Sequence, residues 1–355
     1  MKLIFWQNIV SPHQSFLIRE LAERHEVILA VLKEVSIERV KQGWSRPDTG
    51  RAEVIVLENQ QIANKIKENN TDAINIFSGI ANYKIIDKVF RETNNDDFNV
   101  VIVEAGSIIG WQRHFRKLIY RIKAFIYRDK IDVILAMGNL GAEWYSSVGF
   151  SKEKIHRFQY FTELPKIEEL NISKLECVSP VFLFIGQLID RKNIIQLVKA
   201  MNGLKSYEWR LNIIGDGPQR TRLKDLITAL GLENRITLYG NMDNTDAMNF
   251  LVNSDYLVLP SKFDGWGAVI NEALSRGVKV ITNENCGASC IVKEIQWGIV
   301  YRTNNLNDLQ KALLNEVINF KRPSMNEKIC KSKEFEVNYT LNRVNEFEKL
   351  LLDNV

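Results

Sequence analysis

Two carboxylates flank a glycine-rich turn in the segment FDGWGAVINEAL. Asp264 and Glu272 stand eight positions apart, and Gly265, Trp266 and Gly267 follow the first acid directly. Glycine costs about 1 kcal/mol relative to alanine inside a helix, so helix stability does not explain the turn. A carboxylate on such an open side of a helix accepts hydrogen bonds from a vicinal diol such as ribose, and the bare backbone amides of the turn suit a phosphate. The alternative is a solvated glutamate at a helix edge.

Two basic residues stand where a strand gives way to a helix, in VFLFIGQLIDRKNIIQLV. The strand is expected to end at Gly186 and the helix to begin near Asn193, which places Arg191 and Lys192 at the helix N-terminus. Cations at that end oppose the helix macrodipole. Either both side chains turn to water, or an anion such as a diphosphate binds there and relieves the conflict.

A Gly-x-Gly turn follows the next strand, in WRLNIIGDGPQRTRL. Gly215, Asp216 and Gly217 form the turn, and Pro218 suits the first position of a helix. The pattern matches half of a dinucleotide fingerprint, but Arg220 occupies the place of the third glycine. An ordinary strand-to-helix turn is the plain interpretation, and a dinucleotide site is the alternative.

The first half of the chain offers two titratable residues near strand ends. Glu104 closes the strand NVVIVEAG, and His13 follows the first strand of the chain. Either side chain can bind an acceptor hydroxyl or stabilise charge on a sugar, so both are candidate catalytic residues. A simple capping role is the alternative for each.

Basic residues are concentrated in the segment 111–128, WQRHFRKLIYRIKAFIYR. At helical spacing, its apolar residues gather on one side and its Lys and Arg residues cover the rest. A helix packed on the core with a solvated basic face is the plain interpretation. Adsorption to anionic lipid without insertion is the alternative, at about 1 kcal/mol per Lys or Arg. The apolar residues are Trp111, Phe115, Leu118, Ile122 and Phe125; the basic residues are Arg113, Arg116, Lys117, Arg121, Lys123 and Arg128.

The elements that must position these residues alternate between strand and helix along the 355-residue chain. This alternation predicts an α/β protein with parallel sheets covered on both faces, and the length predicts two domains. The first domain is expected over 1–165 and the second over 170–335, with a linker at 160–180. The final helix, 338–355, is expected to pack back on the first domain. Two doubly wound domains facing each other would leave ligand sites at the carboxyl ends of their strands.

Composition excludes several classes of function. A net charge of +4 is too small to indicate nucleic acid as a partner. Four scattered cysteines make no disulfide framework, and no secretory signal precedes the first strand, so a cytoplasmic location is expected. No apolar run is long enough to span a membrane. The second half shows no cluster of acidic or histidine ligands, and no metal or cofactor is expected.

Beside these observations, the second half resembles the donor-binding domain of the group 1 retaining nucleotide-sugar glycosyltransferases. Proteins of this family have the GT-B fold, in which two Rossmann-like domains face a central cleft. The family's glycine-arginine-leucine and lysine element is similar to GQLIDRKN, its GDGP turn is present as written, and its paired acids match Asp264 and Glu272. The order and spacing of the three motifs agree from about residue 181 to residue 300.

The resemblance implies a role for each matched residue. Lys192 would contact the donor diphosphate, Glu272 the ribose hydroxyls, and Asp264 the transferred sugar, which makes Asp264 a candidate catalytic residue. The turn after RITLYG would lie against the base. The implied donor-binding residues are Gly186, Gln187, Arg191, Lys192, Gly215, Asp216, Gly217, Asn241, Met242, Gly265, Trp266, Gly267 and Glu272.

The sequence departs from the family pattern at two positions. Gln187 stands where the family often has arginine, so Arg191 is expected to meet the diphosphate charge instead. Asp264 replaces the usual glutamate and shortens the reach of the carboxylate by about one C–C bond, ~1.5 Å.

The resemblance therefore implies a metal-independent, retaining glycosyltransferase that takes a nucleotide-sugar donor and a glycan or polyprenyl-diphosphate-linked acceptor. The expected setting is surface polysaccharide biosynthesis (lipopolysaccharide, capsule or exopolysaccharide), in the cytoplasm or at the inner face of the plasma membrane, with segment 111–128 on anionic lipid. Two alternatives stay open. One is a non-catalytic partner that binds nucleotide sugar, and the other is an NAD-type oxidoreductase, which the missing third glycine disfavours.

Overall fold

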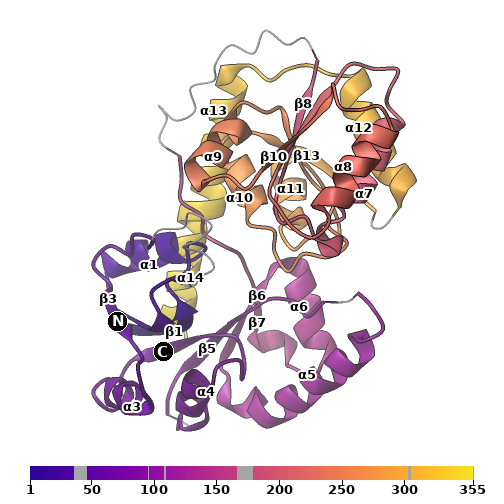
Figure 1. Ribbon diagram of the computed structural model, residues 1–355. Helices are drawn as coiled ribbons and strands as arrows, with labels where there is room; N and C mark the ends of the chain where they lie inside the picture. The colour runs from indigo at the N-terminus through magenta and orange to yellow at the C-terminus, as the bar shows by residue number, and fades with distance from the viewer. Residues whose placement is uncertain (36–45, 95, 108, 166–178, 303–304, 355) are drawn as a thin grey trace. The chain divides into compact units, whose positions relative to one another are not determined.

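The chain folds into two compact units (Figure 1). The computed structural model describes residues 1–35, 46–94, 96–107, 109–165, 179–302 and 305–354. The first unit is Met1–Glu163 together with Leu341–Val355, and the second is Leu164–Thr340. Most of the linker predicted at 160–180 lies outside the described residues.

The first unit is built on a seven-stranded sheet in the order β3-β2-β1-β4-β5-β6-β7, with every pair parallel. Its inner strands are almost wholly buried, as expected of a parallel sheet covered on both faces. The strands are β1 (Lys2–Ile9), β2 (Glu26–Lys33), β3 (Glu53–Val56), β4 (Ile74–Ser78), β5 (Asn99–Val103), β6 (Val133–Met137) and β7 (Ile155–Phe158). The described helices are α1 (Ser15–Ala22), α3 (Gln60–Glu68), α4 (Lys84–Arg91), α5 (Arg113–Tyr127), α6 (Gly138–Ser147) and α14 (Asn342–Leu352).

The second unit repeats the plan with a six-stranded parallel sheet in the order β10-β9-β8-β11-β12-β13. Phe182, Phe184 and Trp209 are fully buried in its core. The indole Nε1 of Trp209 donates to the Leu204 carbonyl at 2.9 Å. The strands are β8 (Val181–Ile185), β9 (Arg210–Ile214), β10 (Ile236–Gly240), β11 (Tyr256–Leu259), β12 (Lys279–Asn283) and β13 (Gly298–Tyr301). The described helices are α7 (Ile194–Asn202), α8 (Arg220–Ala229), α9 (Asn244–Val252), α10 (Val269–Leu274), α11 (Ser289–Ile295), α12 (Leu306–Ile318) and α13 (Met325–Glu336).

Each sheet has one point where the strand order reverses. In the first unit the chain builds outward from β1 to β3 and then returns to the other side of β1 with β4. In the second unit it builds from β8 to β10 and returns beside β8 with β11. The loops that leave the two central strands diverge there, so open parallel sheets bind ligands at this place. The predicted α/β, doubly wound fold of both units is confirmed.

Helix α5 corrects one interpretation drawn from the sequence. Its apolar side does not pack on the core: Phe115 is 65% exposed and Phe125 74%, and Trp111, in the turn before the helix, is 85% exposed. The helix instead covers the first unit with the opposite side, where Ala124 and Tyr127 are buried. A helical period identifies an apolar side but does not say that this side faces the core. The core-packed interpretation of the apolar side is therefore wrong.

The C-terminal helix α14 lies beside α1 in the first unit (Figure 1). The ring of Phe347 is 5.5 Å from that of Phe158, and Phe347 is buried. Glu348 accepts from His25 Nε2 at 2.6 Å and also pairs with Arg24. One aromatic contact and one small ionic cluster thus fix the end of the chain to this unit.

Replacing Phe347 with alanine should destabilise the first unit by about 3–5 kcal/mol, because a buried aromatic ring is lost and leaves a cavity. Hydrogen exchange should quicken in α1 and β7 and stay unchanged in β8–β13. Leu352→Ala is the control, since Leu352 is exposed. Faster exchange spread equally over both sheets would contradict this assignment of α14.

Candidate functional site

Two loops meet at the reversal point of the second sheet. One leaves β8 and carries residues 186–193, and the other leaves β11 and carries residues 260–268. Because β8 and β11 are neighbouring parallel strands, their carboxyl ends bring the two loops together. The GQLIDRKN motif and the first acid of FDGWGAVINEAL therefore share one place in the fold.

Asp264 joins the two loops through its carboxylate. Lys192 Nζ lies 2.5 Å from Oδ2, and Arg191 Nη1 lies 3.3 Å from Oδ1. Ser261 Oγ also donates to Oδ2, at 3.3 Å. Asp264 is buried, so its charge requires partners of this kind. Two cations against one carboxylate leave a net positive charge at the reversal point, which suits an anionic ligand.

Backbone hydrogen bonds reinforce the same junction. Lys262 N donates to the Arg191 carbonyl at 2.8 Å, and Arg191 Nη1 donates to the Phe263 carbonyl at 3.1 Å. Asn193 adopts a left-handed conformation, with φ +59°, immediately before α7, and its Nδ2 donates to the Pro260 carbonyl at 3.2 Å. Arg191 and Lys192 therefore belong to a short turn that is held against the second loop.

The GDGP turn packs against the first loop, backbone to backbone. Leu188 N donates to the Asp216 carbonyl at 2.9 Å, and Gln219 N donates to the Leu188 carbonyl at 3.0 Å. A Cβ atom on Gly215 would lie only 2.0 Å from the Gly186 carbonyl oxygen. The glycine at this position is required by loop packing, whatever the turn binds. Asp216 uses its carboxylate locally, accepting from the Gly217 amide at 2.7 Å.

Trp266 anchors the glycine-rich turn from inside. Its side chain is buried, and its indole Nε1 donates to Asn271 Oδ1 at 2.8 Å. Gly267 has φ +92°, and a Cβ atom there would lie 2.7 Å from Cys286 Sγ. Gly287 packs on the same turn, because a Cβ atom there would lie 2.2 Å from the Gly265 carbonyl oxygen. The turn is thus shaped by close packing.

Glu272 projects from α10, one turn beyond the glycines. The residue is half-buried, and its backbone carbonyl accepts from Arg276 Nη1 at 3.2 Å. Burial raises the pKa of its carboxyl group, and the charge of Arg276 offsets part of that rise. In the described parts of the chain, no hydrogen bond or ion pair ends on its carboxylate oxygens. The side chain keeps its acceptor capacity for a ligand.

The remaining predicted donor residues lie in loops at the carboxyl ends of the same sheet. Gln187 directly follows Gly186 and is exposed. Asn241 is exposed and Met242 half-buried, both in the turn after β10. That turn leaves a strand two places from β8 in the sheet order.

Several residues that the sequence did not single out hold the Asp264 loop in place. Asn283 Nδ2 donates to the Ser261 carbonyl at 2.8 Å, and Asn285 Nδ2 donates to the Lys262 carbonyl at 3.0 Å. Asp264 N in turn donates to the Asn285 carbonyl at 3.0 Å. The sequence does indicate that these residues lie near the site, because they follow the buried strand VKVIT at its carboxyl end.

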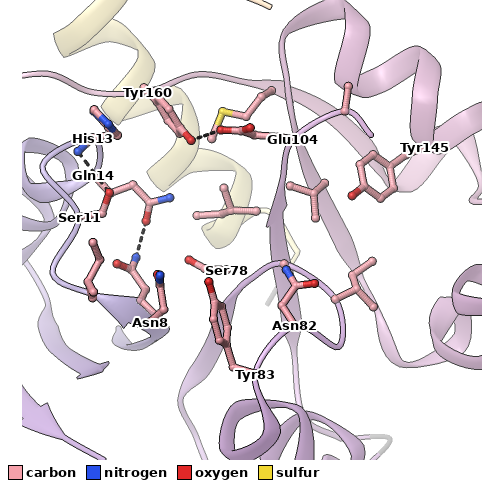
Figure 2. A pocket seen from close by; sticks show the side chains of 18 of the residues that line it. Asn8, Ser11, His13, Gln14, Ser78, Asn82, Tyr83, Glu104, Tyr145 and Tyr160 are labelled. Carbon is pink, nitrogen blue, oxygen red and sulfur yellow. Dashed lines mark hydrogen bonds between the residues drawn. The ribbon is translucent and has the colours of Figure 1, made fainter. Parts of the chain in front are cut away.

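The first unit has a pocket of about 440 Å³ at its own reversal point, between β1 and β4 (Figure 2). Amides, hydroxyls and aromatic rings dominate its lining, and Glu104 is the single carboxylate among the lining residues. They are Gln7, Asn8, Ile9, Ser11, His13, Gln14, Ser78, Gly79, Ile80, Asn82, Tyr83, Ile102, Val103, Glu104, Ala105, Tyr120, Met137, Tyr145 and Tyr160.

The pocket brings together the two acceptor-side candidates, His13 and Glu104, around a third residue. The His13 ring stacks on the ring of Tyr160, with centroids 4.7 Å apart, and the Tyr160 hydroxyl donates a short hydrogen bond to Glu104 (Figure 2). Sequence reasoning missed Tyr160, because it falls just beyond β7, in a stretch that reads as linker. The arrangement presents a carboxylate and an imidazole beside a polar, uncharged wall.

Two properties of the described residues bear on the chemistry of the chain. Among them, no group of three or more His, Cys, Asp or Glu side chains is placed to hold a metal ion. None of the helices that the structure describes is both long and apolar enough to cross a bilayer.

Together, the two parallel sheets with their helices match the GT-B fold. A crystal structure of Anabaena Alr3699/HepE in complex with UDP and glucose superposes with a TM-score of 0.71 over 100% of both chains, at 15% identity. Residues 166–329 match the family described as glycosyl transferases group 1. This match confirms the resemblance that the motifs of the second half carry.

Curated relatives extend the likeness beyond this domain. An uncharacterized 41.2 kDa protein in the cps region of Klebsiella pneumoniae is 23% identical over 78% of this chain and 77% of its own length. The lipopolysaccharide core biosynthesis glycosyltransferase LpsE of Rhizobium meliloti is 27% identical over 48% of this chain. This match covers 50% of the length of LpsE.

The packing of the GDGP turn can be tested with a matched pair of glycines. Gly215→Ala should lower the free energy of unfolding by roughly 2–5 kcal/mol, because backbone strain at φ +132° adds to overpacking on Gly186. Gly231 also has a positive φ, +60°, but nothing lies within 4 Å of an added Cβ atom. Gly231→Ala should therefore cost only about 1–2 kcal/mol. If urea denaturation showed that both variants lose the same free energy of unfolding, the GDGP turn and the loop at Gly186 would not be in such close contact.

Proposed function

We propose that this protein is a retaining glycosyltransferase that moves a sugar from a nucleotide-sugar donor to a glycan or lipid-linked glycan. The junction of Arg191, Lys192 and Asp264 at the reversal point of the second sheet carries the proposal. It combines two cations for a diphosphate with one buried carboxylate for the sugar. Such a site favours departure of a charged nucleotide diphosphate.

In the proposed complex, Lys192 and Arg191 bind the donor diphosphate. Both now pair with Asp264, so the arriving phosphates share cations that are already in position. Preformed positive charge of this kind stabilises the negative charge that develops on the leaving group. The same two cations support metal-independent transfer, without a cofactor.

Glu272 is proposed to bind the ribose hydroxyls and Asp264 the transferred sugar. Burial raises the pKa of Glu272, so its carboxylate takes up a proton at a higher pH than an exposed glutamate does. The turn at Asn241 and Met242 is proposed to lie against the base. No side-chain nucleophile is assigned, and a same-face displacement accounts for retention of configuration.

The pocket of the first unit is proposed to bind the acceptor. Glu104 and His13 are the candidate groups for an acceptor hydroxyl, with Tyr160 positioning the carboxylate. Among its lining residues there is no lysine or arginine, and the polar lining groups suit the hydroxyls of a neutral sugar ring.

We place the reaction in surface polysaccharide biosynthesis, at the cytoplasmic side of the membrane. One relative takes part in lipopolysaccharide core biosynthesis and another is a protein in a cps region. A non-catalytic partner that only binds nucleotide sugar is the rival. Release of free sugar from a panel of nucleotide sugars by the purified protein would separate an enzyme from such a partner.

Glu272→Ala should weaken binding of free nucleotide diphosphate and of intact donor alike, by roughly 10- to 100-fold. The reason is loss of a charge-assisted hydrogen-bonding partner of the diol, typically about 1.5–3 kcal/mol. Calorimetry with both ligands makes the measurement, with exposed Glu233→Ala as the control. Unchanged affinity of the Glu272 variant for both ligands would refute its role.

Asp264→Ala and Asp264→Asn should behave differently from Glu272→Ala. Free nucleotide diphosphate should bind almost normally, while transfer falls sharply, because the carboxylate acts on the sugar during reaction. The asparagine variant keeps the shape of the side chain and an oxygen that accepts a hydrogen bond from Lys192. It therefore separates the loss of the negative charge from the loss of this contact. Equal losses of affinity for nucleotide and for donor would mean that Asp264 serves the diphosphate end.

The first-formed product should keep the anomeric configuration of the donor sugar. A proton NMR time course, begun before mutarotation or secondary hydrolysis, reads the configuration directly from the anomeric coupling constant. An inverted first product would contradict the proposed same-face displacement, and it would leave the donor-site assignments to be judged by calorimetry.

A further inference from the structure

A buried glutamine near the carboxyl end of β1 lines the pocket of the first unit. Gln7 is 1% exposed, and among the described residues its Oε1 atom has no hydrogen-bond partner. Buried side-chain amides are nearly always paired, because a group that loses its water without gaining a partner destabilises the fold. At the wall of a pocket, a donor on the bound ligand is the partner that such an oxygen lacks.

A second glutamine holds this amide in place. Gln7 Nε2 donates a short hydrogen bond to Oε1 of Gln14, the N-cap residue of α1, which is 5% exposed. The Gln14 side chain points into the pocket (Figure 2). Since the two amides are bonded to each other, the pair presents one hydrogen-bond acceptor and one donor at fixed positions.

The charge of the lining favours an uncharged ligand. Glu104 supplies a carboxylate, and the described lining residues include no lysine or arginine. Lys123 reaches the same wall from α5, but its Nζ donates to the Ile80 carbonyl at 2.7 Å, and Lys123 is not part of the lining. A phosphate or carboxylate on the ligand would therefore lie near Glu104 without a cation to pair with it. Like charges in a partly desolvated site repel each other.

Tyrosine rings supply the apolar part of the pocket. Tyr83, Tyr120 and Tyr160 line it together with Ile9 and Ile80. Ligand sites combine apolar surface of this kind with a few fixed polar groups that set orientation and specificity. A pyranose ring has the matching chemistry, because it carries apolar C–H faces and a rim of hydroxyls. The volume of about 440 Å³ lies within the range of small-molecule sites.

We propose that Gln7 and Gln14 are specificity residues for the acceptor, and that the pocket takes an uncharged sugar unit whose hydroxyl or amide N–H donates to Gln7 Oε1. The charge of Glu104 excludes sugars that carry a phosphate or a carboxylate. This inference rests on the proposed function, in which the pocket binds the acceptor. Neither glutamine belongs to the proposed donor site.

The same charge argument places the reaction in an order. On a lipid-linked acceptor, the diphosphate lies outside this pocket, so at least one uncharged sugar separates it from the accepting hydroxyl. An earlier transfer of a sugar to the lipid phosphate must supply that unit. The protein therefore extends a glycan and does not start one.

Binding of small sugars to the full chain, followed by saturation-transfer NMR, tests the assignment without donor or turnover. At least one of methyl glucoside, methyl galactoside and methyl N-acetylglucosaminide should bind, whereas methyl glucuronide and glucose 6-phosphate should not. Gln7→Met keeps the length of the side chain but removes both hydrogen-bonding atoms, and it should weaken binding of the neutral glycoside by about 10-fold. Glu104→Gln should admit the glucuronide, because it removes the repelling charge.

Asn99→Leu is the matched control for Gln7→Met. Asn99 is also 1% exposed, and its Oδ1 likewise has no partner among the described residues. It stands at the amino end of β5, however, and does not line the pocket. Whatever the melting temperature of Asn99→Leu, its glycoside binding should equal that of wild type.

Three outcomes would overturn the proposal: no binding of any neutral glycoside, equal binding of neutral and anionic sugars by wild type, or unchanged binding by Gln7→Met. Continued exclusion of the glucuronide by Glu104→Gln would overturn the role of that charge. Nucleotide binding, measured by calorimetry on the same variants, should stay at the wild-type value. Failure of the wild-type protein to bind any nucleotide sugar would contradict the proposed function instead, whatever the glycoside result.

Discussion

The buried carboxylate of Asp264 is the constraint on which the second unit's site depends. A charge removed from water must be paired, and its partners, Lys192 and Arg191, lie 72 and 73 residues earlier in the chain. The sheet makes that pairing possible, because β8 and β11 are neighbours whose carboxyl ends face the same way. The ion pair then fixes both loops, and the glycines of the GDGP turn allow a third loop to approach. Packing and charge thus hold Arg191 and Lys192 together at one place in the fold.

The same topology gives the first unit a site of the opposite electrostatic character. Its reversal point between β1 and β4 is lined by amides, hydroxyls and aromatic rings around Glu104, with no lysine or arginine among them. The second unit concentrates Arg191 and Lys192 at the corresponding place. A shared fold positions the sites, and the side chains on the loops decide what each site binds.

Much of the fold followed from the sequence, because strands such as LIFWQ and VILAV are buried on both faces and read as continuous apolar runs. The short strands β7 and β13 were missed, since both are partly exposed and carry no such run. Motif spacing located Lys192, Asp264 and Glu272, but the ion pair between Lys192 and Asp264 joins loops that lie 72 residues apart in the chain. Tyr160 and Asn283 act through tertiary contacts with Glu104 and Ser261. The sequence places Asn283 at the end of a strand, but it identifies neither of these partners.

Helix α5 shows where periodicity stops being informative. An apolar stripe on a helix indicates a side that avoids water, but it leaves open whether protein or lipid covers it. In α5 the protein covers the side of Ala124 and Tyr127, and the stripe of Phe115, Ile122 and Phe125 remains in solvent. Exposed apolar area of this size is unfavourable in water.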